Sequence, residues 1–481
     1  MKTSREVIRM STYESVNFYD PTIWGPILLV GVLFASLLLA NIIKTKVPFF
    51  KKQLIPNSVL GGLMILIIST ICFYTKGTYL FNLTIFSQAG RGNSILEVLT
   101  YHCLGIGFVA MTLRPSGTKV TKKRSGEVIS SGALTVSGYL IQGFFGMIIT
   151  LVAYRIIGIA PGSGILLAFG YGQGTGQALN IGKNFDAYFG GGGTYANMGL
   201  SLAALGFLVA SIAGVAYFNV LRKKGKVKIA DDSFEIKMSE VMGENEVPNS
   251  ESVDKLSIQI CFILIAYSMA YGIMYLLGKV VGGMIGTVYG FNFLFGVLSA
   301  VIVKAVINLL KKWGWLKKDY LNVYLLNRIS GFAFDLMIVA GICAIQIDLI
   351  TNYIGVIMIL GIVGAVTTFL YVRFVCKRIF PEYSYEQFFA FFGMLTGTAS
   401  TGMMLLRAAD PELKTPASEN LVYQNFPAIV MGLPVLILAT SITGNAADPT
   451  TAFIMTCVCA IYFLLLNVII FRSKIFKRKA K

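Results

Sequence analysis

The sequence has few charged residues and almost no histidine. Charged side chains make up 13% of its 481 residues and His102 is the only histidine, whereas hydrophobic side chains make up 55%. The mean hydropathy is +0.71, and the charged share is well below the roughly 25% of soluble domains. This composition excludes an ordinary soluble domain and predicts an all-α polytopic membrane protein.

The sequence also lacks the motifs of common enzymes. It has no HExxH, and a Ser-His-Asp triad could form only at His102, which no G-x-S-x-G accompanies. The run from Gly172 to Gly176 lacks the G-x-G-x-x-G spacing of a dinucleotide site, and Gln177 stands where a phosphate-binding loop before Lys183 needs glycine. We therefore expect neither an enzyme nor a cofactor, and we expect His102 to be a hydrogen-bonded packing residue.

The cysteines form no recognisable metal or redox motif. No C-x-x-C pair occurs, and no cysteine has a histidine at metal-ligand spacing. Most of them lie inside apolar runs, so we expect buried thiols and no transition-metal site. The seven are Cys72, Cys103, Cys261, Cys343, Cys376, Cys457 and Cys459.

Eleven apolar runs are long enough to cross a bilayer, which takes about 20 residues. They cover residues 22–43, 57–75, 95–114, 129–158, 197–221, 257–279, 285–309, 327–346, 351–375, 420–442 and 449–471. The net charge is +18, and most lysines and arginines fall on one side when the loops alternate across a membrane. Because basic loops are typical of the cytoplasmic side, we predict a cell-membrane protein with its N-terminus outside and its C-terminus cytoplasmic, and no nucleic-acid partner.

Two glycine-rich stretches interrupt this pattern. The first, from Ala168 to Asn197, is too rich in glycine for a stable continuous helix. At membrane depth an interrupted backbone is tolerated only where protein buries it or where it lines a wet cavity, so we predict re-entrant hairpins at about 163–196 and about 385–410. A shift of 223 residues aligns Gly170 with Gly393, Gly174 with Gly397, Thr175 with Thr398 and Asn197 with Asn420.

The predicted topology makes the two halves inverted repeats, because the first hairpin enters from outside and the second from the cytoplasm. Such repeats with paired broken elements are typical of secondary transporters. The domains are an extracellular N-terminal segment (1–21), a first repeat of five spans and a hairpin (22–221), a cytoplasmic linker (222–256), a second such repeat (257–442), and an additional helix with a basic cytoplasmic tail (443–481).

The hairpin tips are rich in oxygen atoms that could bind a coupling cation. Unwound glycines free backbone carbonyls, and neighbouring hydroxyls add further ligands. Asp335 is the one acid placed well inside a span, where it marks an ion pathway or pairs with Arg328 or backbone donors. The candidate sodium ligands are Gly172, Gly174, Thr175, Gly176, Thr396, Gly397, Thr398, Ser400, Thr401 and Asp335. Tight helix packing is the alternative role for such small residues.

The same hairpins carry polar side chains that could orient a substrate. Unpaired N–H groups at helix N-termini favour anions. Gln173, Gln177 and Asn180 are candidate substrate ligands, and Lys183 or Arg407 could pair with a carboxylate. Either cation could instead be an interfacial anchor.

Three motifs resemble the bacterial sodium/glutamate symporter family. They are Ile55 to Leu63, Gly172 to Gly176 and Gly397 to Thr401. In that family an I-P-x-x-x-x-G-G-L segment opens the second span, G-H-G-T-G forms the first tip and G-A-T-P-T the second; Gln173 and Ser400 replace the histidine and the proline here. The resemblance implies sodium-coupled uptake of L-glutamate or a similar small carboxylate by elevator-like alternating access, with the tips as the site and a homodimer as the assembly.

Other functions stay open. A carrier of hydroxycarboxylates or another organic anion would share this architecture. A channel would need a continuous polar pore, and neither an acidic ring nor a repeated filter is visible. A membrane-embedded enzyme would need ionisable groups that face one cavity, for which Asp335 and His102 are poor material.

Overall fold

The computed structural model describes residues 18, 21–47, 55–87, 90–115, 122–190, 192–225, 254–281, 285–316, 318–410, 414–445 and 447–479. Almost all of the expected outer N-terminal segment lies outside these ranges. So does the central part of the expected linker, residues 226–253.

The described residues form helices joined by short connections, without a strand. Eleven of these helices are long and apolar enough to span a membrane, so the chain is an all-α polytopic membrane protein. They are α1 (Pro21–Lys46), α3 (Asn57–Lys76), α4 (Gly92–Leu113), α5 (Lys122–Ile157), α8 (Thr194–Lys223), α10 (Lys255–Val281), α12 (Asn292–Lys312), α13 (Val323–Cys343), α14 (Ile354–Ile379), α18 (Asn425–Gly444) and α19 (Pro449–Lys479). Each coincides with one of the predicted apolar runs.

Shorter helices connect or interrupt the long ones. The short α-helices are α6 (Leu166–Gln173), α7 (Thr175–Phe189), α11 (Ile285–Gly290), α15 (Ser384–Leu395), α16 (Ala399–Ala409) and α17 (Ala417–Tyr423). The 3-10 turns are η1 (Leu80–Asn82), η3 (Ser163–Ile165), η5 (Asp348–Tyr353) and η6 (Pro381–Tyr383).

Local sequence explains several helix boundaries that hydropathy does not locate. The predicted run 285–309 is divided at Phe291, whose backbone leaves helical geometry between α11 and α12. The side chain of Asn322 accepts a hydrogen bond from the backbone N–H of Leu325 and fixes the start of α13. At α19, hydrogen bonds from Thr451 and Thr450 lower the pKa of Asp448, which therefore stays charged as the N-terminal cap.

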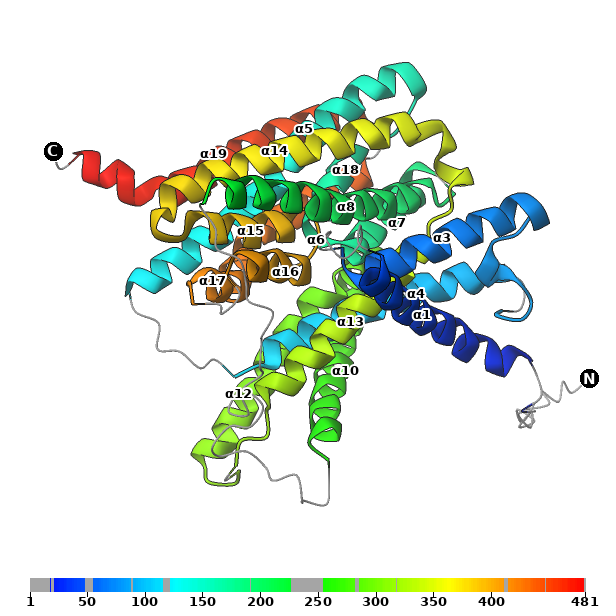
Figure 1. The fold of residues 1–481 in the computed structure, drawn as a ribbon, viewed down its shortest axis with the longest axis horizontal. Helices are drawn as coiled ribbons and strands as arrows, with labels where there is room; N and C mark the ends of the chain where they lie inside the picture. Colours follow the sequence, from blue (N-terminus) through cyan, green and yellow to red (C-terminus); the bar gives the residue numbers. More distant parts are fainter. Residues whose placement is uncertain are drawn as a thin grey trace, which may run out of the picture.

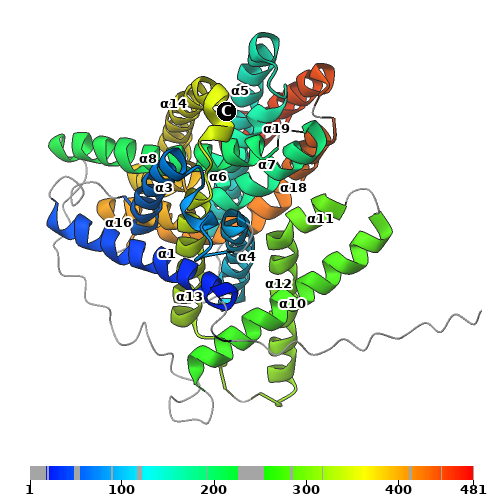
Figure 2. The same ribbon diagram turned by 90° about the vertical axis from the view of Figure 1, so that its right-hand side faces the viewer.

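The helices group into two bodies. The six-helix body consists of α1, α3, α4, α10, α12 and α13, in which α4 packs along both α12 and α13. The hairpin body consists of α5 to α8 and α14 to α19, with α5 in contact with α14, α18 and α19. Figure 1 shows the long helices of the hairpin body running nearly side by side, while α10, α12 and α13 cross below them, and Figure 2 shows α10 to α12 set to one side.

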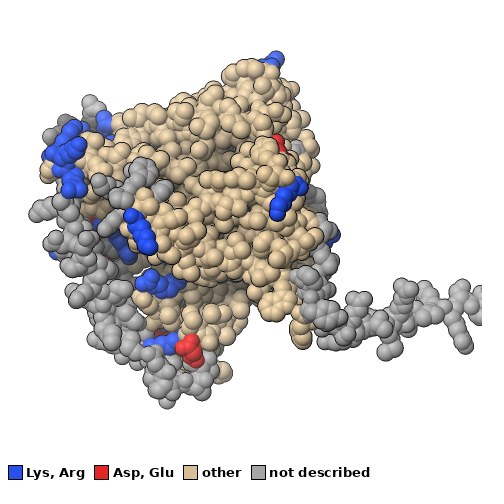
Figure 3. All heavy atoms as spheres, turned by 45° about the vertical axis from the view of Figure 1, so that its right-hand side comes forward, with Lys and Arg blue, Asp and Glu red and all other residues tan. Residues whose placement is uncertain are grey.

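Most of the surface is suited to lipid. Large apolar side chains such as Ile71, Leu276 and Leu464 are more than half exposed, which in a membrane protein is the expected outer face. Figure 3 shows a broad uncharged face with lysine and arginine mostly near its margins. Five of the seven cysteines are buried, as expected, whereas Cys261 and Cys457 are exposed on α10 and α19.

Candidate functional site

The first interrupted element joins α6 to α7 at Gly174. This residue has φ 78° and ψ −170°, a conformation that side chains essentially exclude, so only glycine ends α6 and starts α7 here without strain. The start and the end of the element lie together, because the backbone N–H of Ala160 donates to the hydroxyl of Tyr195 over 2.8 Å. Helices α6 and α7 contact each other, and the chain turns back at Gly174.

The second interrupted element joins α15 to α16 through Thr396, Gly397 and Thr398. Thr398 is extended, with φ −140° and ψ 172°, and α16 begins directly after it. The two helices pack closely and antiparallel: a Cβ added to Gly402 would lie 2.3 Å from the carbonyl oxygen of Ala390. Glycine is therefore required for this approach.

Helix α5 holds both elements. A Cβ on Gly146 would lie 2.1 Å from the carbonyl oxygen of Gly164, so the chain entering α6 touches the C-terminal half of α5. Near the N-terminal half, Gln387 of α15 donates to Ser131 over 3.1 Å. The two elements therefore approach the middle of α5 from its opposite ends.

The two tips meet beside the middle of α5. A Cβ on Gly174 would lie 3.2 Å from Cγ2 of Thr398, so the interrupted backbones are in contact. The amide of Gln142 donates to the carbonyl oxygen of Leu395 and to the hydroxyl of Thr368, both over 2.8 Å. The buried amide is therefore a hydrogen-bond partner for the carbonyl group at the end of α15, which has no partner within that helix.

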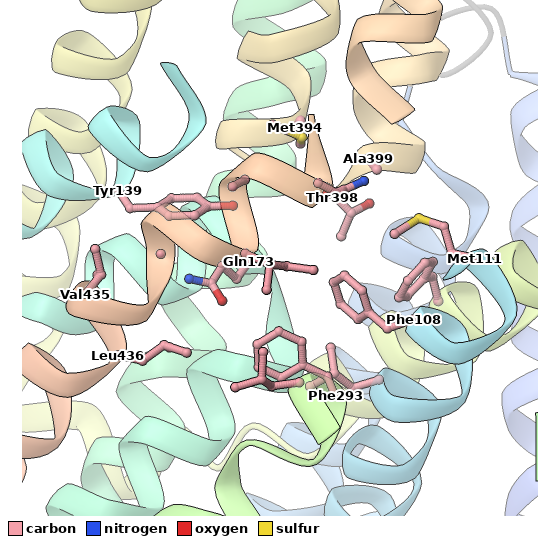
Figure 4. A pocket seen from close by; sticks show the side chains of 18 of the residues that line it. Phe108, Met111, Tyr139, Gln173, Phe293, Met394, Thr398, Ala399, Val435 and Leu436 are labelled. Carbon is pink, nitrogen blue, oxygen red and sulfur yellow. The ribbon is translucent and has the colours of Figure 1, made fainter. Parts of the chain in front are cut away.

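A cavity opens next to the tips, between the two bodies (Figure 4). In Figure 4 the side chain of Gln173 points into it, with Tyr139 and Thr398 on the same side and Phe108 and Phe293 opposite. The lining residues are Leu104, Phe108, Met111, Tyr139, Gly172, Gln173, Phe293, Leu294, Phe334, Met337, Met394, Thr398, Ala399, Asn425, Ala428, Ile429, Gly432, Val435 and Leu436.

The two walls of this cavity differ in polarity. The wall from the six-helix body is entirely apolar and consists of Leu104, Phe108, Met111, Phe293, Leu294, Phe334 and Met337. All of the polar lining side chains, namely Tyr139, Gln173, Thr398 and Asn425, come from the hairpin body. A polar ligand would therefore find its hydrogen-bonding partners on the hairpin body.

Most of the predicted sodium ligands lie together at the tips. Thr175 is buried and donates to the carbonyl oxygen of Met337 over 3.2 Å, and the hydroxyls of Thr398 and Thr401 are 3.5 Å apart. Gly172 and Thr398 line the cavity. Gly174, Gly176, Thr396 and Gly397 are buried around it.

Two of the predicted sodium ligands lie apart from this cluster. Ser400 is exposed on the first turn of α16. Asp335 accepts a hydrogen bond from the hydroxyl of Ser58 over 2.9 Å and belongs to the contact between α13 and α3. Its donor there is a side-chain hydroxyl, whereas the predicted alternative was Arg328 or a backbone donor.

The predicted substrate ligands are dispersed. Gln173 lines the cavity. Asn180 donates to the carbonyl oxygen of Gly290 over 2.9 Å, and Lys183 forms an ion pair of 2.5 Å with Glu97 of α4. Arg407 is exposed on α16 and does not line the cavity.

Gln177 is a special case among these candidates. Its side chain is 1% exposed, and neither of its amide atoms has a hydrogen-bond partner among the described residues. A buried amide without partners is costly and needs an explanation such as a bound water or ligand.

Sequence reasoning missed the apolar wall. Phe108, Phe293 and Phe334 form a ring cluster, with centroids 5.2 Å apart for Phe108 and Phe293 and 5.5 Å for Phe108 and Phe334. Aromatic residues inside spans are so common that nothing marked these three as lining residues. His102, by contrast, fits its expectation: its Nδ1 lies 2.9 Å from the hydroxyl of Tyr267.

These features define a polytopic helical membrane protein with a cavity between two bodies and two interrupted helix pairs that meet beside one long helix. Comparison with models of known protein families and with curated proteins finds no match to the chain.

The tip geometry makes Gly174 less replaceable than other glycines with positive φ. We expect Gly174→Ala to cost about 1–3 kcal/mol of stability, because of its backbone conformation and its contact with Thr398. The matched control is Gly190→Ala, at φ 80° and ψ 31° with no atom within 4 Å of the added Cβ, which should cost less. Thermal unfolding of the purified variants measures both; equal losses would contradict the tip geometry.

Proposed function

We propose that this protein is a secondary active transporter that couples sodium entry to uptake of a small carboxylate. The observation that carries the proposal is the cavity between two bodies, bounded on one side by two interrupted helix pairs that meet. Secondary transporters bind substrate and ion near the bilayer midplane, between discontinuous helices of this kind.

The composition of the two bodies supports inverted repeats. The six-helix body takes α1, α3 and α4 from the first half and α10, α12 and α13 from the second. The hairpin body takes α5, α8 and one interrupted pair from the first half, and α14, α18 and the other pair from the second. The approach of the pairs from opposite ends of α5 supports re-entrant hairpins that enter from opposite faces of the membrane.

The oxygen atoms at the tips support sodium as the coupling ion. Carbonyls around Gly174 and Gly397 and the hydroxyls of Thr398 and Thr401 are hard oxygen ligands close to one another, and Thr175 adds a hydroxyl on the residue directly after Gly174. Thr175 donates its proton to a carbonyl, so its oxygen lone pairs stay available for a cation. Sodium would thus bind beside the substrate and neutralise its charge.

A carboxylate substrate is supported by the helix N-termini at the tips. Helix α16 begins at Ala399, which lines the cavity together with Thr398. Unpaired N–H groups there favour an anion, and Gln173 could orient it. The resemblance to the bacterial sodium/glutamate symporters names L-glutamate as the first substrate to test; a hydroxycarboxylate or other organic anion carrier is the alternative.

An elevator-like movement and a homodimer complete the proposal. In such a movement the hairpin body would carry the bound substrate past the six-helix body. The apolar wall of the six-helix body would present no polar group to be broken and remade during the passage. The distribution of basic loops supports a cell-membrane protein with a cytoplasmic C-terminus and an outer N-terminus.

Transport is tested with purified protein in liposomes. We expect a radiolabelled carboxylate to accumulate above its external concentration when a sodium gradient points inward, because the ion gradient supplies the free energy. Collapse of the gradient should release it. Equilibration without accumulation would indicate a channel, and a chemically altered product would indicate an enzyme.

The threonine hydroxyls at the tips should control the sodium dependence. We expect Thr175→Ala and Thr398→Ala each to raise the sodium concentration for half-maximal uptake about tenfold, since one hydroxyl bound to a charged group contributes roughly 1.5 kcal/mol. Thr175→Ser and Thr398→Ser keep the hydroxyl and should retain the sodium dependence. Thr440→Ala, on α18 away from the tips, controls for protein abundance. Unchanged sodium dependence in both alanine variants would exclude these hydroxyls as ligands.

The inverted topology predicts opposite accessibility of the two hairpins. In a cysteine-free background, Tyr188→Cys near Gly190 should react with a membrane-impermeant maleimide added outside intact cells. Lys414→Cys, three residues after Pro411, should react only in inverted vesicles. Tyr188 and Lys414 are both exposed, so protein burial should not limit either reaction. Labelling of both from one face would refute the topology.

A further inference from the structure

The cavity beside the tips has no charged side chain among the described residues that line it. The charged residues that the sequence suggested as ligands do not line this cavity. Lys183 forms an ion pair with Glu97, Asp335 accepts a hydrogen bond from Ser58, and Arg407 is exposed on α16. A ligand in this cavity therefore has the helix N-termini and a few neutral polar groups to meet its charge.

Three of the four polar lining side chains lie at one end of the cavity. Gln173, Tyr139 and Thr398 lie on the side of the tips, as Figure 4 shows. Within the described part of the chain, the side chains of Tyr139 and Gln173 form no hydrogen bond with another side chain or backbone group. Both side chains therefore remain available to a ligand. This end can hold one carboxylate together with the proposed sodium ion.

The opposite end is an apolar and largely aromatic wall. Phe108 is in ring contact with both Phe293 and Phe334 there, and Met111 and Met337 belong to the same wall. Such a surface gains free energy by covering apolar groups and itself offers no compensation for a second desolvated charge. The adjoining pocket, which shares Phe108 and Met111, contains Arg114, whose guanidinium already donates to Asn327 and to the carbonyl oxygen of Met111. We therefore expect the part of the ligand that contacts the rings to be apolar.

We propose that the cavity selects a small monocarboxylate with one branched or aromatic apolar group, in preference to a dicarboxylate such as L-glutamate. The carboxylate lies at the hairpin tips and the apolar group contacts Phe108, Phe293 and Phe334. This inference rests on the proposed function for the carboxylate, whereas the polarity of the two walls determines the selectivity.

The test uses two pairs of ligands that match in length and differ at the far end. The first pair is 4-methylpentanoate and pentanedioate; the second, which adds an α-amino group, is L-leucine and L-glutamate. Dissociation constants are measured in sodium chloride on the purified full-length protein, by thermal shift and by calorimetry. We expect the apolar member of at least one pair to bind, and to bind about 100-fold tighter than its dicarboxylate partner, because the second carboxylate would be buried without a partner.

A pair of variants on the wall tests the contact itself. Phe108→Leu enlarges the apolar end and should shift the affinity ratio of 3-phenylpropanoate to 4-methylpentanoate about tenfold toward the larger ligand. Phe332→Leu is the matched control, because Phe332 is 53% exposed and stacks on Phe34 away from the cavity. A merely destabilising effect of Phe108→Leu would weaken both ligands equally and leave the ratio unchanged, which would contradict the contact.

The outcomes separate this inference from the proposed function. Tighter binding of pentanedioate or L-glutamate, or no binding of any of the four ligands, would overturn the selectivity; sodium-driven accumulation of L-glutamate would at the same time support transport. Binding of 4-methylpentanoate or L-leucine without accumulation in liposomes under a sodium gradient would uphold the selectivity and overturn transport.

Discussion

The contact between two interrupted backbones is the constraint on which this structure depends. A helix that ends at membrane depth leaves N–H and C=O groups without intrahelical partners, and lipid offers none. Here Gly174 and Thr398 bring the two interruptions together, and Gln142 from the neighbouring helix donates to the carbonyl at the end of α15. Each tip is tolerated because the other tip and α5 bury it.

That burial requires helices to approach more closely than ordinary side chains allow. Gly146 and Gly164 bring α5 against the start of the first pair, and Gly393 and Gly402 bring α15 against α16. In lipid, where apolar side chains gain little by leaving the solvent, such small-residue contacts supply much of the packing energy. Glycine therefore has two structural roles in this chain. It interrupts the helices at the tips, and it allows the resulting short helices to pack closely against their neighbours.

The sequence predicted the spans well because hydropathy and length respond directly to the thickness of a bilayer. The interruptions at Gly174 and Gly397 were also predictable, since glycine clusters oppose continuous helix. The division at Phe291 was not, because it arises from local backbone geometry inside an apolar stretch.

The structure brings some of the predicted site residues together at the tips and places others elsewhere. Gln173 and Thr398 line the cavity, whereas Lys183 is paired with Glu97 and Asp335 lies against α3. Composition cannot distinguish a lysine that binds a ligand from one that joins two helices. Nor can it distinguish an aromatic residue that faces lipid from Phe108, because both are apolar residues on a spanning helix.

The unequal polarity of the cavity walls links the fold to a mechanism. If both walls held a polar ligand, movement of one body past the other would have to break hydrogen bonds in a poorly hydrated space, which is costly. In the proposed elevator-like movement, a ligand held by the polar lining groups of the hairpin body would keep these partners while that body moves, and only apolar contacts with Phe108, Phe293 and their neighbours would be exchanged. Such contacts are non-directional and can be remade at each position along the path. Under the same proposal, the apolar wall of the six-helix body would act as a filter, because a second charge on the ligand would have to pass it without a partner among the residues of that wall.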